Sequence, residues 1–598
     1  MKIKKLLQRI SLYVFAGFIL LSLVFLLLIN SILTPIAERK IKNGVIKGSD
    51  SLYRVNIGHL QLHLFSGNAE LEDITLIPDT QLFRKRQQSG RAPAELSTLH
   101  VKRIIITGAH PFRYLFHKQA DVGTISLENP EGTLSQFPET KQKPVQSKTL
   151  YQQISAQIRR ISVAQINLEH IRLVYRDFTG GKPVNSSFSE LSLKATELLI
   201  DSASQQDTTR TLYCRDIVTE IKNFKGRTPD GNYRYSLQSA TYSTQGQRLQ
   251  ASGVAIIPLP KELFFVRSKD DRFSLEMKSL TLERFRFRDF QLYQKIEAGK
   301  IKAEAGSFDV SGNPNGPVSA TDRLVTFPHY TLRHLKNKIL IDTLAVSGME
   351  ISYHEVNTQA GKTGMIRFTN TSARFLHISN DSMANVRQNS TQLSLSSRFM
   401  NTGKLELSAS FNLTDPAYSY QVSGHLAGMP LDDINPAVMP LALAAIKKGE
   451  LNSLDFKLSG NNKKVVGNVR LLYHDLSVVL LGSSPGEAYH AKPLKTLAAK
   501  IFVVKSANPD TPGTIPRSAR VIFLRPKSSP FFKTLWSSLL SGIKPCAGMG
   551  DTQKQAVPKP LTKKEERAKK KAVKKALKEK AKADKVHRKQ LEKQLHRE

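Results

Sequence analysis

The pattern of hydrophobic and polar residues divides the chain into an apolar start and a long region of alternating residues. From Ile10 to Leu33 there is no charged side chain, and apolar residues cover every face of a helix drawn through this run. The run is long enough to cross a bilayer as one helix. The candidate anchor positions along it are Ile10, Val14, Phe18, Leu21, Phe25 and Leu28.

Two other interpretations compete with a membrane anchor. A buried helix of a soluble domain would show a polar stripe, which this run lacks. A cleaved signal peptide would also begin with basic residues such as Lys2, Lys4 and Arg9, but no small-residue cleavage site follows the apolar run. We therefore expect a retained, single-pass signal anchor over residues 10–33 in the inner membrane. Residues 1–9 would be cytoplasmic and the bulk of the chain periplasmic.

Strand patterns begin after a short polar connector, residues 34–48. From Tyr53 onward apolar and polar residues alternate, as in strands with one buried face. The phase slips at Gly58 and His59, which indicates a bulge. We expect the basic segment from Leu82 to Ala94 to be a loop. Long helical patterns are nearly absent before Pro430, so the sequence predicts a mostly β protein.

One phrase recurs three times, as two apolar residues, an off-phase break and further alternating apolar residues. It runs from Ile166 to Asp177, from Ser279 to Phe290 and from Leu344 to Glu355. The irregular spacing of the copies favours an elongated, repeat-built, antiparallel sheet over a propeller with equal blades. The residues that would line a groove in such a sheet are Ile166, Leu168, Ile171, Leu173, Leu280, Leu282, Phe285, Phe287, Leu344, Val346 and Ile351.

The C-terminal part adds a β module and two helical patterns. The stretch from Leu431 to Gly449 predicts a helix, and two alternating arms around Asn461-Asn462 predict a hairpin. Helical spacing predicts an amphipathic helix within residues 528–548. Its apolar positions are Phe532, Leu535, Trp536, Leu539 and Ile543. Two roles remain open for this helix: lying in an anionic membrane interface, or capping the edge of the last strand.

The amino-acid composition narrows the classes of molecule that the protein is expected to bind. The formal net charge is +38, and the Lys-rich tail, residues 549–598, carries a large part of it. For a domain carried across an inner membrane, this charge favours phospholipid or another anionic lipid over nucleic acid. Other envelope proteins remain open as partners. Cys214 and Cys546 are the only cysteines and lie far apart, so the sequence offers no disulfide framework, metal knuckle or redox pair.

No catalytic motif is complete. Gly361-Lys362-Thr363 is superficially like a P-loop, but Val356 stands where the leading glycine is required. His354-Glu355 lacks the second histidine of a zinc-protease helix, and no GxSxG elbow is present. We therefore expect a protein that is not an enzyme, with no catalytic residue, cofactor or metal site.

Four stretches of the sequence resemble the AsmA-like family of bacterial envelope proteins. They are RVNIGHLQLHLFSGNAELEDITL, INLEHIRLVYRD, GHLAGMPLDDINP and KKGELNSLDFKLSGNNKKVVGNVRLLYHDLSVVLL. The resemblance extends from Lys2 to about Lys544 and leaves the Lys-rich tail outside it. It implies an inner-membrane anchor, an elongated β region over residues 49–430 and a C-terminal β module with one helix over residues 431–527. It also implies a curved sheet with an apolar groove that handles phospholipid between the inner and outer membranes.

The physical argument agrees with this resemblance. A strand with one apolar face must bury that face against a second sheet, a helix layer or a ligand, and few helices are predicted here. We therefore expect a protein that binds or conducts phospholipid in an apolar β groove and supports outer-membrane assembly or homeostasis. The alternative is a membrane-anchored β-sandwich scaffold that docks other envelope proteins.

Overall fold

A computed structural model describes residues 34–63, 66–138, 151–152, 155, 158–179, 183–293, 295–314, 322–482, 488–491 and 504–549. The anchor positions Ile10, Val14, Phe18, Leu21, Phe25 and Leu28 lie outside these residues, as does the Lys-rich tail beyond Met549. Within the described ranges, no helix has the length and apolar character needed to span a bilayer. The expected anchor stays a prediction.

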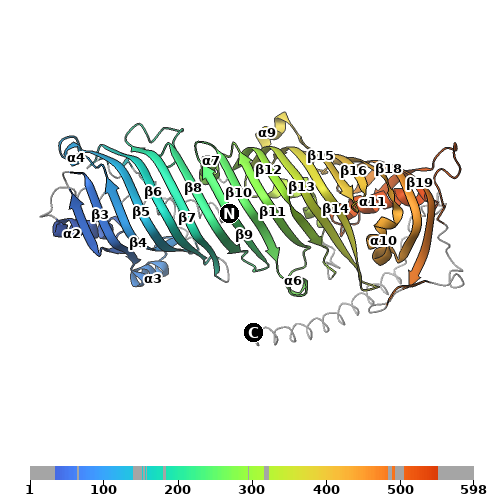
Figure 1. The fold of residues 1–598 in the computed structure, drawn as a ribbon, viewed down its shortest axis with the longest axis horizontal. Helices are drawn as coiled ribbons and strands as arrows, with labels where there is room; N and C mark the ends of the chain where they lie inside the picture. The colour runs from blue at the N-terminus through green and yellow to red at the C-terminus, as the bar shows by residue number, and fades with distance from the viewer. Residues whose placement is uncertain are drawn as a thin grey trace.

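One long, open β-sheet makes up most of the described molecule (Figure 1). Its strands are β1 (Tyr53–Asn56), β2 (His59–His63), β3 (Asn68–Pro78), β4 (Glu95–Thr107), β5 (Gln119–Gln136), β6 (Arg160–Asp177), β7 (Val184–Ile200), β8 (Asp216–Arg227), β9 (Tyr233–Ser243), β10 (Arg248–Pro258), β11 (Arg272–Glu283), β12 (Ile296–Ser311), β13 (Ile339–Asn357), β14 (Lys362–Ser379), β15 (Ser390–Phe399), β16 (Gly403–Asn412), β17 (Tyr420–Pro430), β18 (Ala444–Gly460), β19 (Lys464–Gly482), β20 (His490–Ala491) and β21 (Ser518–Leu524). From β3 to β19 each strand pairs with the next along the chain. At the two ends, β1 and β2 both pair with β3, and β21 and the two-residue β20 both pair with β19.

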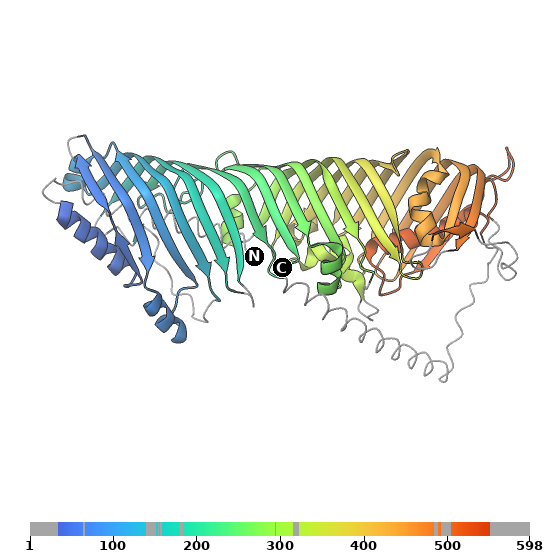
Figure 2. The same ribbon diagram turned by 60° about the horizontal axis from the view of Figure 1, so that its bottom comes forward.

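Short helices lie at the ends and along the edges of this sheet. They are α2 (Thr34–Gly48), α3 (Thr80–Gln88), α4 (Pro111–His117), α6 (Lys261–Arg267), α7 (Phe287–Tyr293), α8 (Pro328–His334), α9 (Ser382–Arg387), α10 (Asn435–Ala442) and α11 (Phe531–Cys546), with 3-10 turns η2 (Arg323–Thr326) and η3 (Leu431–Ile434). Helices α4, α7 and α9 project from the upper edge of the sheet in Figure 1, and α3 and α6 project from the lower edge. Figure 2 shows α2 at one end of the sheet and the C-terminal helices at the other.

Two strand pairs are parallel, so the sheet is mixed and largely antiparallel. The parallel pairs are β5 with β6 and β12 with β13. Each requires the chain to return across the sheet, through residues 137–159 and 312–338. The expected sheet was antiparallel throughout, and these two crossovers correct that expectation. They divide the sheet into three units: β1–β5, β6–β12 and β13–β21.

A kink in the middle of the strands follows one line across the sheet. Asn223, Gly253, Ala305 and Gly348 have positive φ values of 52°, 58°, 48° and 63° and lie at one register level of β8, β10, β12 and β13. Asn129 and His170, with φ values of 49° and 55°, lie side by side at the parallel pair β5–β6. A positive φ bends an extended chain and moves the next side chain out of phase. The off-phase break read from the sequence is therefore a general feature of these strands.

Two local predictions are confirmed. The Asn461-Asn462 turn joins β18 to β19. The amphipathic helix is α11. The phase slip at Gly58 falls between β1 and β2, but the bulge expected there is absent, because both strands pair with β3 in one continuous register.

Three other local predictions are wrong. The segment from Leu82 to Ala94 was expected as a loop, but its first residues, up to Gln88, belong to α3. This helix forms because the Asp79 side chain accepts a hydrogen bond from the Leu82 amide and caps its N-terminus. The helix expected up to Gly449 ends at Ala442, and β18 begins at Ala444. The phrase from Ser279 to Phe290 is not one kinked strand, because β11 ends at Glu283 and α7 begins at Phe287.

Candidate functional site: the apolar face of the sheet

One face of the sheet is apolar along its whole length. The strand registers place side chains of successive strands directly beside one another, so the face can be followed from strand to strand. We call the following line the central row: Ile171, Leu191, Ile221, Ala240, Ala251, Leu280, Ala303, Val346, Ala373, Leu395, Leu407, Gly424, Phe456 and Val469. Every member is apolar, and the row crosses the parallel pair β12–β13, at Ala303 and Val346, without changing face.

The opposite face is polar and carries ion pairs between strands. Arg103 on β4 reaches Glu70 on β3, with Nε 2.6 Å from Oε1, and Glu128 on β5. Lys302 on β12 pairs with Glu283 on β11 at 2.6 Å. These pairs are partly exposed, so each contributes little to stability. They show that this second face belongs in water.

Burial of the apolar face changes along the sheet. Near the N-terminus, α2 contributes Ile41 and Val45 to a cluster in which Leu71 and Ile104 are almost fully buried. In the middle unit, Leu275, Met277, Leu280 and Leu282 of β11 are only half-buried. Among the described residues, the principal contacts of β9–β12 are with neighbouring strands and with the short helices α6 and α7 at the edges.

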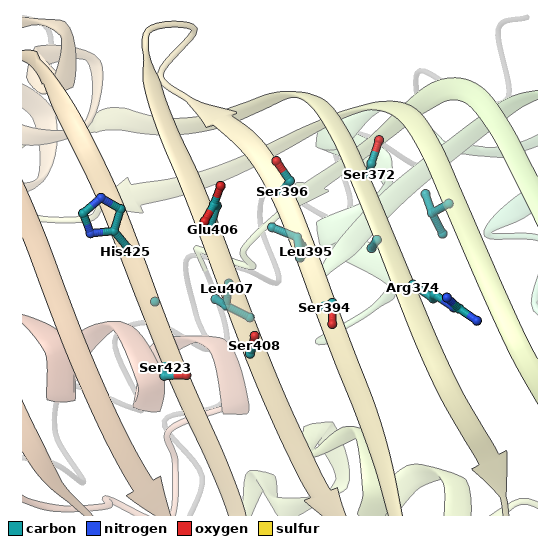
Figure 3. A pocket seen from close by; sticks show the side chains of 13 residues that line it. Ser372, Arg374, Ser394, Leu395, Ser396, Glu406, Leu407, Ser408, Ser423 and His425 are labelled. Carbon is teal, nitrogen blue, oxygen red and sulfur yellow. The ribbon is translucent and has the colours of Figure 1, made fainter.

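The third unit contains a hollow of about 680 Å³. Its lining includes five consecutive members of the central row, Val346, Ala373, Leu395, Leu407 and Gly424, together with the residues that flank them. Figure 3 shows Leu395 and Leu407 on two adjacent strands, alternating with serine and glutamate side chains. The small side chain of Ala373 leaves space in the row, whereas the Phe456 ring fills the space over Gly424, where an added Cβ would clash with Cζ of that ring.

The C-terminal end of the apolar face is closed by the second crossover and by α11. Phe327, which follows η2, is fully buried, with its ring 5.1 Å from Phe531 and 6.0 Å from Tyr420. The buried Arg525 forms an ion pair with Asp322 and donates from Nε to the Asn462 carbonyl oxygen at 2.8 Å. This one side chain therefore ties the second crossover to the β18–β19 turn and to the segment that follows β21.

Nine of the eleven groove candidates lie together on the apolar face. They are Ile166, Leu168, Ile171 and Leu173 on β6, Leu280 and Leu282 on β11, and Leu344, Val346 and Ile351 on β13. The other two do not: Phe285 follows β11 and packs beside the side chains of α7, and Phe287 begins that helix. Leu173 is 4% exposed, within a small cluster with Leu134, Tyr175 and Phe188, so it is a core position.

The apolar side of α11 packs onto the sheet. Leu539 is buried in the C-terminal cluster, Leu535, Trp536 and Ile543 pack against it, and Phe532 is 37% exposed. A Cβ added at Gly542 would lie 2.5 Å from Cγ2 of Val469, so helix and sheet touch closely. These contacts place the helix on the face of the sheet, against β19 and β21, and both proposed roles stay predictions.

Sequence reasoning missed the hollow. Its members on β15 and β16 lie in STQLSLSSRF and GKLELSASFN, which alternate strictly and could have identified the apolar face there. The described residues contain no cluster of potential metal ligands. Burial raises the pKa of the Cys214 thiol to about 12, so this cysteine is unreactive at neutral pH.

Comparison with models of known protein families and with curated proteins finds no match to this chain.

Proposed function

We propose that this protein binds lipid acyl chains on the apolar face of its sheet and conducts phospholipid along it. The observation that carries the proposal is the central row, which stays apolar across every strand pair from β6 to β19, while its large middle members Leu280 and Val346 are only half-buried. Covering an exposed apolar face of this kind with apolar groups lowers the free energy of the protein in water. Covering by acyl chains is worth about 0.8 kcal/mol per methylene group.

The shape of the apolar face suits a long, flexible ligand. Acyl chains need no specific polar partner, and the described residues offer a continuous apolar line with a polar face behind it. The resemblance to AsmA-like proteins supports the same proposal and adds an inner-membrane anchor and a role in outer-membrane assembly. On this basis the protein has no catalytic step, and its ligand is a phospholipid or another anionic lipid.

The proposal is tested by photo-crosslinking in cells that produce the full chain. A photoreactive amino acid is placed at Leu280 on the apolar face or, as the matched control, at Ser279, its neighbour on the polar face with similar burial. We expect phospholipid adducts in mass spectra at position 280 and several-fold fewer at position 279. Protein adducts alone at position 280 would support the scaffold alternative, and equal lipid labelling at both positions would overturn the groove.

A charge at the same position gives a second prediction. Leu280→Glu should lower the lipid recovered with the purified protein several-fold, because an acyl chain cannot cover a carboxylate without removing its water. Ser279→Glu should leave the recovery unchanged. Thermal melts accompany both variants, and loss of cooperative unfolding in Leu280→Glu would mean that a packed core, not a ligand, covers this face.

A further inference from the structure

Large apolar side chains are strongly exposed along one edge of the sheet. On α4, Phe112 and Phe116 are 65% and 77% exposed, and on α9, Met383 and Val386 are 78% and 83% exposed. Tyr293, the last residue of α7, is 71% exposed. The strand order places all three helices at the same edge, the upper one in Figure 1.

The opposite edge differs. Its helices α3 and α6 turn Phe83 and Phe264 inward, where these side chains are 4% and 1% exposed. The most exposed apolar residue on α6 is Val266, at 42%. The apolar tips are therefore a property of one edge and not of edge helices in general.

The exposed side chains are held outward by buried partners on the same helices. Tyr114 of α4 packs against the N-terminal cluster, and Phe290 of α7 is buried. On α9, the buried Asn385 side chain contacts His377 Nε2 at 3.1 Å and donates to the Ser379 carbonyl oxygen at 3.3 Å. Phe112 and Phe116 are four residues apart, and Met383 and Val386 three apart, so each pair shares one face of its helix.

Basic residues accompany these apolar tips. Lys118 and Arg159 lie beside α4, and Lys336, Lys338 and Arg387 lie at or near α9, all of them exposed. Short helices that present apolar side chains among exposed cations are the combination expected at an anionic membrane interface.

We propose that this edge of the sheet, through α4, α7 and α9, lies on an anionic lipid surface. Phe112, Phe116, Tyr293, Met383 and Val386 enter the interface, and the neighbouring lysines and arginines meet the lipid phosphates. The contact gives the sheet a lengthwise orientation on the membrane and places the rim of the apolar face beside lipid. It does not depend on lipid being bound along that face.

The test uses the full chain reconstituted in vesicles. Cys214 and Cys546 are fully buried, so a cysteine introduced at the surface can be labelled selectively. An environment-sensitive fluorophore is attached to Phe116→Cys, Met383→Cys or, at the opposite edge, Val266→Cys. Vesicles contain phosphatidylcholine with or without phosphatidylglycerol, and lipids carrying a doxyl quencher report contact with the bilayer.

We expect several-fold stronger quenching at positions 116 and 383 than at position 266 in anionic vesicles, with a decrease in neutral vesicles and at high salt. In the 383-labelled chain, Lys336→Glu with Lys338→Glu should reduce the quenching, while the same pair of changes should leave position 116 unaffected. No quenching at 116 and 383, as for a surface that docks a protein, or equal quenching at 266 would overturn the proposal. Unchanged quenching at 383 in the charge-reversed chain would also overturn it.

Discussion

At the scale of single residues, His329 is the clearest case of a polar group held in an apolar place. Its ring is 1% exposed and lies 5.5 Å from Phe411 and 5.8 Å from Tyr418. Burial lowers the pKa of His329 from its usual value near 6.5, and Arg333 lowers it further while Asp415 opposes the shift. The folded end of the sheet therefore disfavours a proton that the unfolded chain accepts readily.

This lowered pKa predicts that the protein becomes less stable as the pH is lowered. As the pH drops through about 6.5, unfolded chains take up a proton at His329 that folded chains do not, so the free energy of unfolding decreases. His329→Phe should flatten this dependence, because phenylalanine suits the aromatic surroundings and does not titrate. Denaturant melts at pH 7.5 and 5.5 measure it, with the exposed His63→Gln as control. An equally steep pH dependence in His329→Phe would contradict the prediction.

At the scale of elements, the hydrophobic alternation predicted the apolar face well, because every second side chain of a strand points to the same face. It also contained the kink, since apolar residues of the face stand three apart where φ is positive, as with Ile221 and Phe224 on either side of Asn223. The phrase ending at Phe290 was misplaced because the alternation of β11 continues by chance through Arg284 into α7.

The alternation could not reveal which parts of the apolar face are covered by other side chains. Leu173 and Leu280 have the same pattern around them, yet Leu173 is in a core cluster and Leu280 is half-buried. The difference depends on side chains of other strands, such as Phe188, brought near by pairing. Helix α3 was missed for a related reason. Seven of its residues are polar and only Phe83 is buried, so the helix has too few apolar residues for a helical period to appear in the sequence.

The fit of α11 against the sheet gives a prediction for this element. Gly542→Ala would bring a methyl group to 2.5 Å from Val469 Cγ2, so the helix must move off β19 and β21. We expect a loss of about 1–3 kcal/mol in the free energy of unfolding. Ser541→Ala, at the preceding and partly exposed position, is the control. An unchanged midpoint in Gly542→Ala would show that α11 does not rest tightly on the sheet.

At the scale of the whole molecule, the two parallel pairs make the middle unit separable. Ile125 of β5 pairs with Ile166 of β6, and Ile301 of β12 pairs with Leu344 of β13, so both crossovers join apolar positions in the same way. Strands β6 and β13 also carry the kink at corresponding places, His170 and Gly348.

Removing residues 137–311, which joins Gln136 to Gly312, should therefore leave a shorter protein in which β5 pairs with β13. The retained crossover, residues 312–338, is long enough to return across the sheet. Circular dichroism should retain a β spectrum with a cooperative melt, and small-angle scattering should show a shorter maximum dimension. Removing residues 137–243 is the control, because residues 244–247 span at most about 14 Å and cannot cross the sheet. Aggregation of both variants alike would refute separable units.

The line of kinks has a mechanical consequence. A flat ribbon flexes easily out of its plane, whereas a ribbon creased along its length resists flexing, as an angle iron does. Asn223, Gly253, Ala305 and Gly348 set such a crease at right angles to the strands, along the long axis of the sheet. A one-layer sheet without a crease would bend easily along its long axis, so we expect the crease to stiffen the sheet from β8 to β13.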